Sequence, residues 1–278
     1  MNNERDINEI ARELAHNFSP EQLREKWEQR EAGDKYPAGE IGEAERAYWH
    51  NVFQEPQRSP SAIMVSKATK QEMEYSEARK KVWNLMQLRA AHISDLEGIN
   101  FEWEFDEEER ERNANLLKYF INDPTAVLPD GKPFPLSKGL FLFGAPGTGK
   151  TEIMRVFEKF CLDNDLSKQF RFTSMSEVYT KTRLNADYDP VKDNVQFDRA
   201  FDEFGRYVGA VMRFGEGIDV NESILEQRYE RMKRYGQLTH LIANLTPNET
   251  ESQFSPMIFD RVRSMCTGVY FKGKSKRQ

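Results

Sequence analysis

The sequence has little cysteine and no long apolar run, and both absences exclude classes of protein. The two cysteines, Cys161 and Cys266, lie far apart in the 278 residues and form no CxxC pair. Neither a disulfide framework nor a zinc site is therefore indicated. No stretch approaches the roughly 18 apolar residues of a membrane-spanning helix, and residues 1–5 lack the apolar region of a secretory signal. We expect a soluble, cytoplasmic protein without membrane contact.

A large excess of charge of one sign is also absent. The chain has 46 acidic and 40 basic residues, which gives a net charge of −6. Tight binding of nucleic acid would therefore need a local basic patch, because overall charge does not supply one. The 38% of hydrophobic residues can bury a substantial core, in one large domain or two smaller ones.

A phosphate-binding motif stands near the middle of the chain. It reads Gly144, Ala145, Pro146, Gly147, Thr148, Gly149, Lys150 and Thr151. An apolar run over 140–143 precedes it and an amphipathic stretch over 152–162 follows it, so strand, loop and helix are predicted in that order. Such a loop holds phosphates on backbone N–H groups at a helix N-terminus. A glycine-rich turn that binds nothing is the alternative, but the complete motif in this setting favours a nucleotide.

Each polar residue at the end of this motif has an expected role. The Lys150 ammonium would contact the β and γ phosphates of ATP, and the Thr151 hydroxyl would bind Mg²⁺. Hydrolysis also needs an acid for the metal and a group that activates water. Asp202 is the candidate for the metal and Glu203 for the water. An ordinary surface acid pair is the alternative, since apolar and polar residues alternate over 195–198 just before them.

Asn244 follows the mostly apolar run over 238–243. A side chain at the carboxyl end of a parallel strand faces the ligand crevice, so Asn244 could orient water or contact the γ-phosphate. A packing or turn asparagine is the alternative. His240, within the same run, is interpreted as a packed strand residue.

The remaining pattern alternates strands and helices after the phosphate loop. Strands are predicted over 170–173 and 269–271, and helices over 176–184, 221–235 and 256–265. Gly236 would end the second of these helices, and a capping box is predicted over 246–249. The expected fold class is α/β, with a parallel sheet covered by helices on both faces.

The first 97 residues read differently, as charged helices over 20–32, 40–53 and 69–93 with a polar linker over 55–67. The last helix carries a basic cluster formed by Arg79, Lys80, Lys81 and Arg89. A contact with nucleic acid or a partner protein is one interpretation of this cluster, and a solvated helix face is the commoner one. We place the domain boundary near Gly98.

Taken together, the motifs resemble the AAA+ ATPases of the DnaC-type helicase loader and IstB-type transposition helper group. The resemblance covers residues 101–277. Asp202 and Glu203, followed by Phe204 and Gly205, match the Walker B motif of that group. Its sensor 1 strand is matched by Thr239, His240, Asn244 and Leu245, its arginine finger by Arg261 with Arg263 nearby, and its closing Ser-x-Arg by Ser275 and Arg277.

The resemblance implies an AAA+ ATPase domain over 98–278 without a lid domain, preceded by a small helical partner-binding region over 1–97. Glu203, Asn244 and Arg261 would be catalytic, and Arg277 would contact the nucleotide. The implied function is ATP-dependent helicase loading in DNA replication, as a homo-oligomer that binds a replicative helicase, with single- or double-stranded DNA as a further partner. An IstB-like helper that binds a transposase, a P-loop kinase and a weakly hydrolysing ATP-dependent adaptor are the alternatives.

Overall fold

The computed structural model describes residues 71–185, 187–207, 211–213, 216–245, 249, 255–273 and 275–276. All of them belong to a compact unit that runs from Pro60 to Gln278. The helices predicted over 20–32 and 40–53, the predicted linker, most of the capping box over 246–249, and Arg277 lie outside the described residues.

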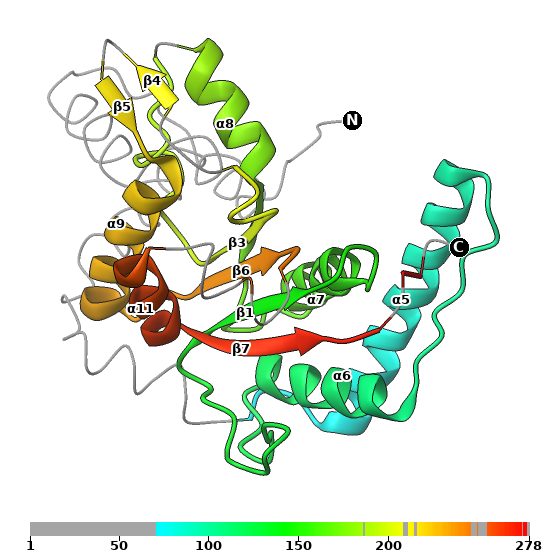
Figure 1. Ribbon diagram of the computed structural model, residues 1–278. Helices are drawn as coiled ribbons and strands as arrows, with labels where there is room; N and C mark the ends of the chain where they lie inside the picture. Colours follow the sequence, from blue (N-terminus) through cyan, green and yellow to red (C-terminus); the bar gives the residue numbers. More distant parts are fainter. Residues whose placement is uncertain are drawn as a thin grey trace, which may run out of the picture. The chain divides into compact units, whose positions relative to one another are not determined.

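A five-stranded sheet forms the centre of this unit (Figure 1). Its strands are β1 (Gly139–Gly144), β2 (Arg171–Ser174), β3 (Arg199–Asp202), β6 (Thr239–Ala243) and β7 (Cys266–Phe271). They lie in the order β2-β3-β6-β1-β7, and every pairing is parallel. The predicted α/β class with a parallel sheet is confirmed.

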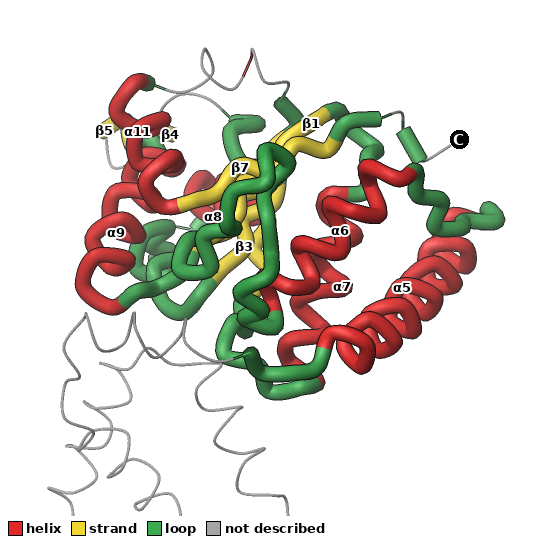
Figure 2. Tube along the Cα trace, turned by 90° about the horizontal axis from the view of Figure 1, so that it is seen from below, coloured by secondary structure: helices red, strands yellow, loops and turns green. Residues whose placement is uncertain are grey.

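The sheet is covered on both faces because the strands bury alternate side chains in two separate cores. Leu140 and Leu142 of β1 pack with α5 (Tyr75–Glu97), α6 (Glu107–Phe120) and α7 (Lys150–Asp163). Phe141, between them, packs with α8 (Met175–Leu184), α9 (Val220–Tyr235) and α11 (Pro256–Met265). Figure 2 shows α5, α6 and α7 on one side of the strands and α9 and α11 on the other.

Local capping chemistry explains where most of these helices begin. Asp106 and Glu109 form a capping box at the start of α6, as its acidic opening predicts. Ser174, Asp219 and Ser255 cap α8, α9 and α11 with their side chains. Gly236 ends α9 in the left-handed conformation, which confirms its predicted role.

Two features differ from the sequence-based expectation. Helix α5, which was assigned to the N-terminal region, buries Ala78, Val82, Met86 and Ala90 in the same core as β1, and the compact unit already begins at Pro60. A short hairpin of β4 (Val211–Arg213) and β5 (Glu216–Ile218) was not predicted. Among the described residues, no helix is both long enough and apolar enough to cross a bilayer.

Candidate nucleotide-binding site

The phosphate loop leaves β1 at the carboxyl edge of the sheet, and its glycines are required by its backbone. Gly144, Gly147 and Gly149 have φ angles of 146°, 80° and 86°, a region that residues with a Cβ rarely adopt. A Cβ on Gly144 would lie 2.2 Å from the Phe271 carbonyl oxygen, and one on Gly147 would lie 2.3 Å from Ser275 Oγ. Both positions therefore accept glycine alone.

The Lys150 side chain turns back into this loop. Its Nζ donates hydrogen bonds of 2.8 Å to the carbonyl oxygens of Gly144 and Ala145, and it lies 3.3 Å from Thr148 Oγ1. The residue is only 3% exposed. Burial lowers the pKa of its ammonium from 10.5 to about 8, although the nearby Asp202 carboxylate opposes the change. A cation is therefore held at the position that the motif predicts.

The helix after the loop starts in a way that suits an anion. Gly149 is the N-cap of α7 and makes no side-chain hydrogen bond to the first helical N–H groups. Those donors and the positive end of the helix dipole point toward the loop. Backbone N–H groups at a helix start after a glycine-rich loop form a phosphate site.

Thr151 and Asp202 meet beside this helix start. Thr151 Oγ1 donates a hydrogen bond of 3.0 Å to Asp202 Oδ1, which also accepts a 3.0 Å bond from the Glu203 backbone N–H. Burial raises the pKa of the Asp202 carboxyl, and these hydrogen bonds oppose the rise. A hydroxyl and a carboxylate are oxygen ligands of the kind Mg²⁺ prefers, so the predicted metal residues fit that ion.

These two residues cannot form a complete metal site. His, Cys, Asp and Glu side chains in the described part of the chain form no group of three that could hold a metal ion. Mg²⁺ usually takes one or two protein ligands and completes its shell with water and substrate phosphates. Thr151 and Asp202 would therefore supply only the protein part of the shell of such an ion.

Glu203 lies directly after β3 in an unusual backbone conformation. Its φ angle is 57°, in the left-handed region that favours glycine. Its carboxylate forms an ion pair with Arg206 one turn along the chain, and the Arg206 side chain is 59% exposed. Left-handed residues other than glycine concentrate at functional sites. The predicted base is therefore at the carboxyl edge of the sheet and paired with a cation.

Strand β6 is buried along its whole length, and the exposed Asn244 follows it. His240 is fully buried, accepts the Leu140 backbone N–H on Nδ1 at 3.2 Å, and packs against Tyr119, Phe120 and Phe170. Its interpretation as a packed strand residue agrees with these contacts. Asn244 is exposed and follows β6, which neighbours both β1 and β3.

Arg261 pairs with a residue of its own chain. It lies on α11, where its Nη2 bonds Glu226 Oε1 on α9 at 3.0 Å, and the side chain is 16% exposed. Its Nη1 is buried without a hydrogen-bond partner among the described residues. Arg263, two residues on, is exposed. To act as an arginine finger on a neighbouring subunit, Arg261 would have to break its contact with Glu226.

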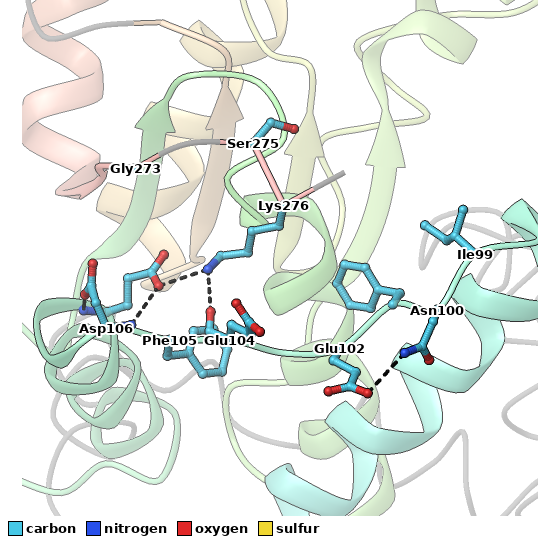
Figure 3. Close-up of a pocket in the computed structure, with 11 residues that line it drawn as sticks. Ile99, Asn100, Glu102, Glu104, Phe105, Asp106, Gly273, Ser275 and Lys276 are labelled. Carbon is cyan, nitrogen blue, oxygen red and sulfur yellow. Dashed lines mark hydrogen bonds and ion pairs between the residues drawn. The ribbon is translucent and has the colours of Figure 1, made fainter. Parts of the chain in front are cut away.

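A cavity of about 800 Å³, which the sequence did not predict, adjoins the phosphate loop (Figure 3). It is lined by residues 99–102, 104–106 and Glu109 together with Gly273, Ser275 and Lys276. Ser275 and Lys276 also contact Gly147 of the loop. Its lining combines the aromatic Phe101 and Phe105 with the carboxylates of Glu102, Glu104, Asp106 and Glu109. In the sequence, these lining residues are marked by the alternation of apolar and acidic residues over 101–105.

Neither a protein-family model nor a curated protein matches the chain. Solved structures show a partial likeness. A candidate primosome component from Streptococcus pyogenes serotype M3 has 16% identity and a TM-score of 0.43 over 62% of this chain and 84% of its own. The DnaC helicase loader has 14% identity and a TM-score of 0.42 over 62% and 94%. DnaI has 18% identity and a TM-score of 0.39 over 50% and 73%.

Proposed function

We propose that this chain is an ATP-binding and ATP-hydrolysing switch of the AAA+ type that acts as a helicase loader in DNA replication. The observation that carries the proposal is the 3.0 Å hydrogen bond between Thr151 and Asp202. It joins the helix start of a complete phosphate-loop motif to the acid predicted for the metal. A turn that binds nothing has no need of this arrangement.

The residues of the chain then have separate tasks. Backbone N–H groups of the loop and of α7 hold the phosphates, and the Lys150 ammonium neutralises their charge. Thr151 and Asp202 hold Mg²⁺, which when bound offsets the negative charge that develops on the phosphates. Glu203 takes a proton from the attacking water, and Asn244 orients that water. Arg261 or Arg263 of a neighbouring subunit supplies a further cation.

The partner is proposed from resemblance and from the division of the chain. The motifs resemble helicase loaders and transposition helpers, and a solved structure with a partial likeness is named as the DnaC helicase loader. Residues 1–59 precede the compact unit and contain no nucleotide motif, so the proposed helicase contact lies there. ATP-dependent assembly of several copies, with DNA as a further ligand, completes the proposal. A transposase in place of the helicase is the IstB-like alternative.

A weakly hydrolysing adaptor is the second candidate, and one observation favours it. The Glu203 carboxylate is paired with Arg206, and a carboxylate neutralised by a guanidinium is a poorer base. An adaptor would bind ATP and change partner affinity with little turnover. A P-loop kinase is disfavoured because Asn244 after β6 and the arginines of α11 match the pattern of an ATPase.

Capture of a replicative helicase tests the proposal. The full chain and its Lys150→Ala variant are each mixed with the purified helicase in ATP or ADP, and bound helicase is measured. We expect capture by the wild-type chain that is stronger in ATP, and no nucleotide effect for the variant. Capture of a transposase instead would select the IstB-like alternative, and capture of neither protein would contradict the assignment to loading.

A further inference from the structure

The end of the described chain lies directly against the phosphate loop. Strand β7 pairs with β1 up to Phe271, which stands opposite Gly144. The C-terminal tail is here the sequence 272–276, of which the structure describes Lys272, Gly273, Ser275 and Lys276. In this tail the Lys276 backbone N–H donates a 2.8 Å hydrogen bond to the Gly147 carbonyl oxygen. The Ser275 side chain lies against the Cα of Gly147, since a Cβ there would approach its Oγ to 2.3 Å.

The Lys276 side chain fastens this tail to the start of α6. Its Nζ donates to the Glu104 carbonyl oxygen at 2.5 Å and to Glu109 Oε2 at 2.9 Å, as Figure 3 shows. The side chains of Lys276 and Glu109 are 16% and 8% exposed. A pair this well buried costs considerable free energy when one partner is removed, because the other charge stays buried and unpaired. Lys276 therefore joins the loop, the tail and the wall of the cavity.

The hydrogen bond from the tail to the Gly147 carbonyl oxygen also sets the direction of the next backbone N–H of the loop. The Gly147 carbonyl and the Thr148 N–H belong to one planar trans peptide, so they point in opposite directions. When the tail holds the carbonyl, it also fixes the Thr148 N–H to point away from the tail. The loop binds phosphate through backbone N–H groups, whose direction decides the strength of each hydrogen bond.

We propose that Lys276 is a positioning residue for the phosphate loop, so that docking of the C-terminal tail and binding of ATP strengthen each other. This inference rests on the proposed binding of ATP. Lys276 need not touch the nucleotide. Because coupling between two sites is reciprocal, a docked tail raises ATP affinity and bound ATP holds the tail in place by the same factor.

The chain offers a matched control in the same tail. Lys272 pairs with Glu108 at 3.5 Å, but both side chains are about 70% exposed, at 68% and 70%. Lys272→Ala removes the same charge from the tail without disturbing a buried pair. Surface pairs of this kind contribute little. Lys276→Arg keeps the positive charge and tests whether that charge restores ATP affinity.

Titration with Mg²⁺-ATP and steady-state hydrolysis compare the wild-type chain with Lys276→Ala, Lys276→Arg and Lys272→Ala. We expect Lys276→Ala to weaken ATP affinity about tenfold, within the usual range of coupling between sites. Its kcat should stay within about twofold of the wild type, because the residue does not act on the reacting atoms. Lys272→Ala should match the wild type, and Lys276→Arg should recover part of the affinity.

Trypsin supplies a measurement that needs no variant, since the tail contains several lysines. Release of the C-terminal peptides from the wild-type chain is followed with and without ATP, and ATP should slow it severalfold. Equal release in both conditions, or unchanged affinity in Lys276→Ala, would overturn the inference while ATP binding stands. If the wild-type chain binds no ATP, the proposed function fails and the inference falls with it.

Discussion

Thr151 Oγ1 donates a 3.0 Å hydrogen bond to Asp202 Oδ1, although the two residues are separated by 51 positions in the chain. Thr151 lies in the first turn of α7 and Asp202 ends β3, with β6 placed between β3 and β1. The carboxyl ends of parallel strands meet at one edge of the sheet, so this contact is a product of strand order. It brings two oxygen atoms of the kind that Mg²⁺ prefers to the N-terminus of a helix, a position that suits phosphate groups.

Substitution of Glu203 should lower the rate of hydrolysis, whereas substitution of Asp202 should change the Mg²⁺ requirement. Glu203→Gln keeps the size of the side chain and removes the base, so hydrolysis should fall at least about 10²-fold while ATP affinity is kept. Asp202→Asn should raise the Mg²⁺ concentration needed for turnover, because one charged metal ligand is lost. Phosphate release measured over a range of Mg²⁺ distinguishes the two. Normal turnover in Glu203→Gln would move the base to another residue.

The pH dependence of ATP affinity should report Lys150. Burial places the pKa of its ammonium at about 8, so the charge that attracts phosphate is lost as pH rises through this value. We expect ATP affinity to be level near pH 7 and to fall above about pH 8. In Lys150→Arg the charge persists, so its affinity should not change over that range. An affinity of the wild-type chain that is independent of pH would contradict the buried position of the ammonium.

The contribution of Lys150 to the stability of the fold should rise with pH, whereas ATP affinity should fall. The folded chain releases the Lys150 proton at about pH 8, whereas an unfolded lysine keeps it to about 10.5. The unfolded state therefore binds more protons between these values, and the contribution of Lys150 to the free energy of unfolding rises with pH. Urea unfolding of the wild-type chain and of Lys150→Met, compared at several pH values, measures this contribution.

Arg261 should show whether the hydrolytic site is shared between subunits. Arg261→Ala subunits keep the phosphate loop, and Lys150→Ala subunits keep the arginine. A mixture should hydrolyse ATP where neither variant does alone, since an arginine supplied in trans can raise turnover about 10³-fold or more. Wild-type turnover by Arg261→Ala alone would make the contact with Glu226 structural and leave exposed Arg263 as the candidate.

Helix α5 should be required by the nucleotide-binding domain. It buries Val82, Met86 and Ile93, and Trp103 Nε1 bonds the Met86 carbonyl oxygen at 2.7 Å. Removing three such buried side chains costs on the order of 5 kcal/mol or more, which is comparable with the whole stability of many domains. A fragment that starts at Gly98 should therefore unfold at a much lower temperature than one that starts at Pro60. Equal melting temperatures, measured by circular dichroism, would contradict this role.

The sequence predicted the elements whose signals are local. The acidic opening at Asp106, the cap at Gly236 and the apolar runs of β1 and β6 depend on neighbouring residues, and each element lies within a few positions of its expected place. The class of fold followed from their alternation. The fixed spacing of the phosphate-loop motif marked Lys150 and Thr151, and the acid pair at the end of β3 marked Asp202 and Glu203; the roles of all four stay predictions.

The features that were missed depend on contacts between distant segments. Charged residues dominate the exposed side of α5, and nothing in that pattern indicates that its other face joins the core of the sheet. The contact of Lys276 with Gly147 and Glu109 links positions that only the path of β7 brings together. Strand β3 has only four residues, Arg199–Asp202, and apolar and polar residues alternate just before it. The strand therefore had no clear apolar run from which to predict it.

Titration of Mg²⁺-ATP into the wild-type chain and into Lys150→Ala tests the central claim most directly. Lys159→Ala is the matched control, because Lys159 lies on the same helix with 60% of its side chain exposed and pairs with Asp163. Saturable binding by the wild type and the control is expected, with affinity at least about tenfold weaker in Lys150→Ala, as for loss of a charge-assisted contact with phosphate. Undiminished affinity in Lys150→Ala, with its circular dichroism unchanged, would contradict the assignment of the loop to ATP.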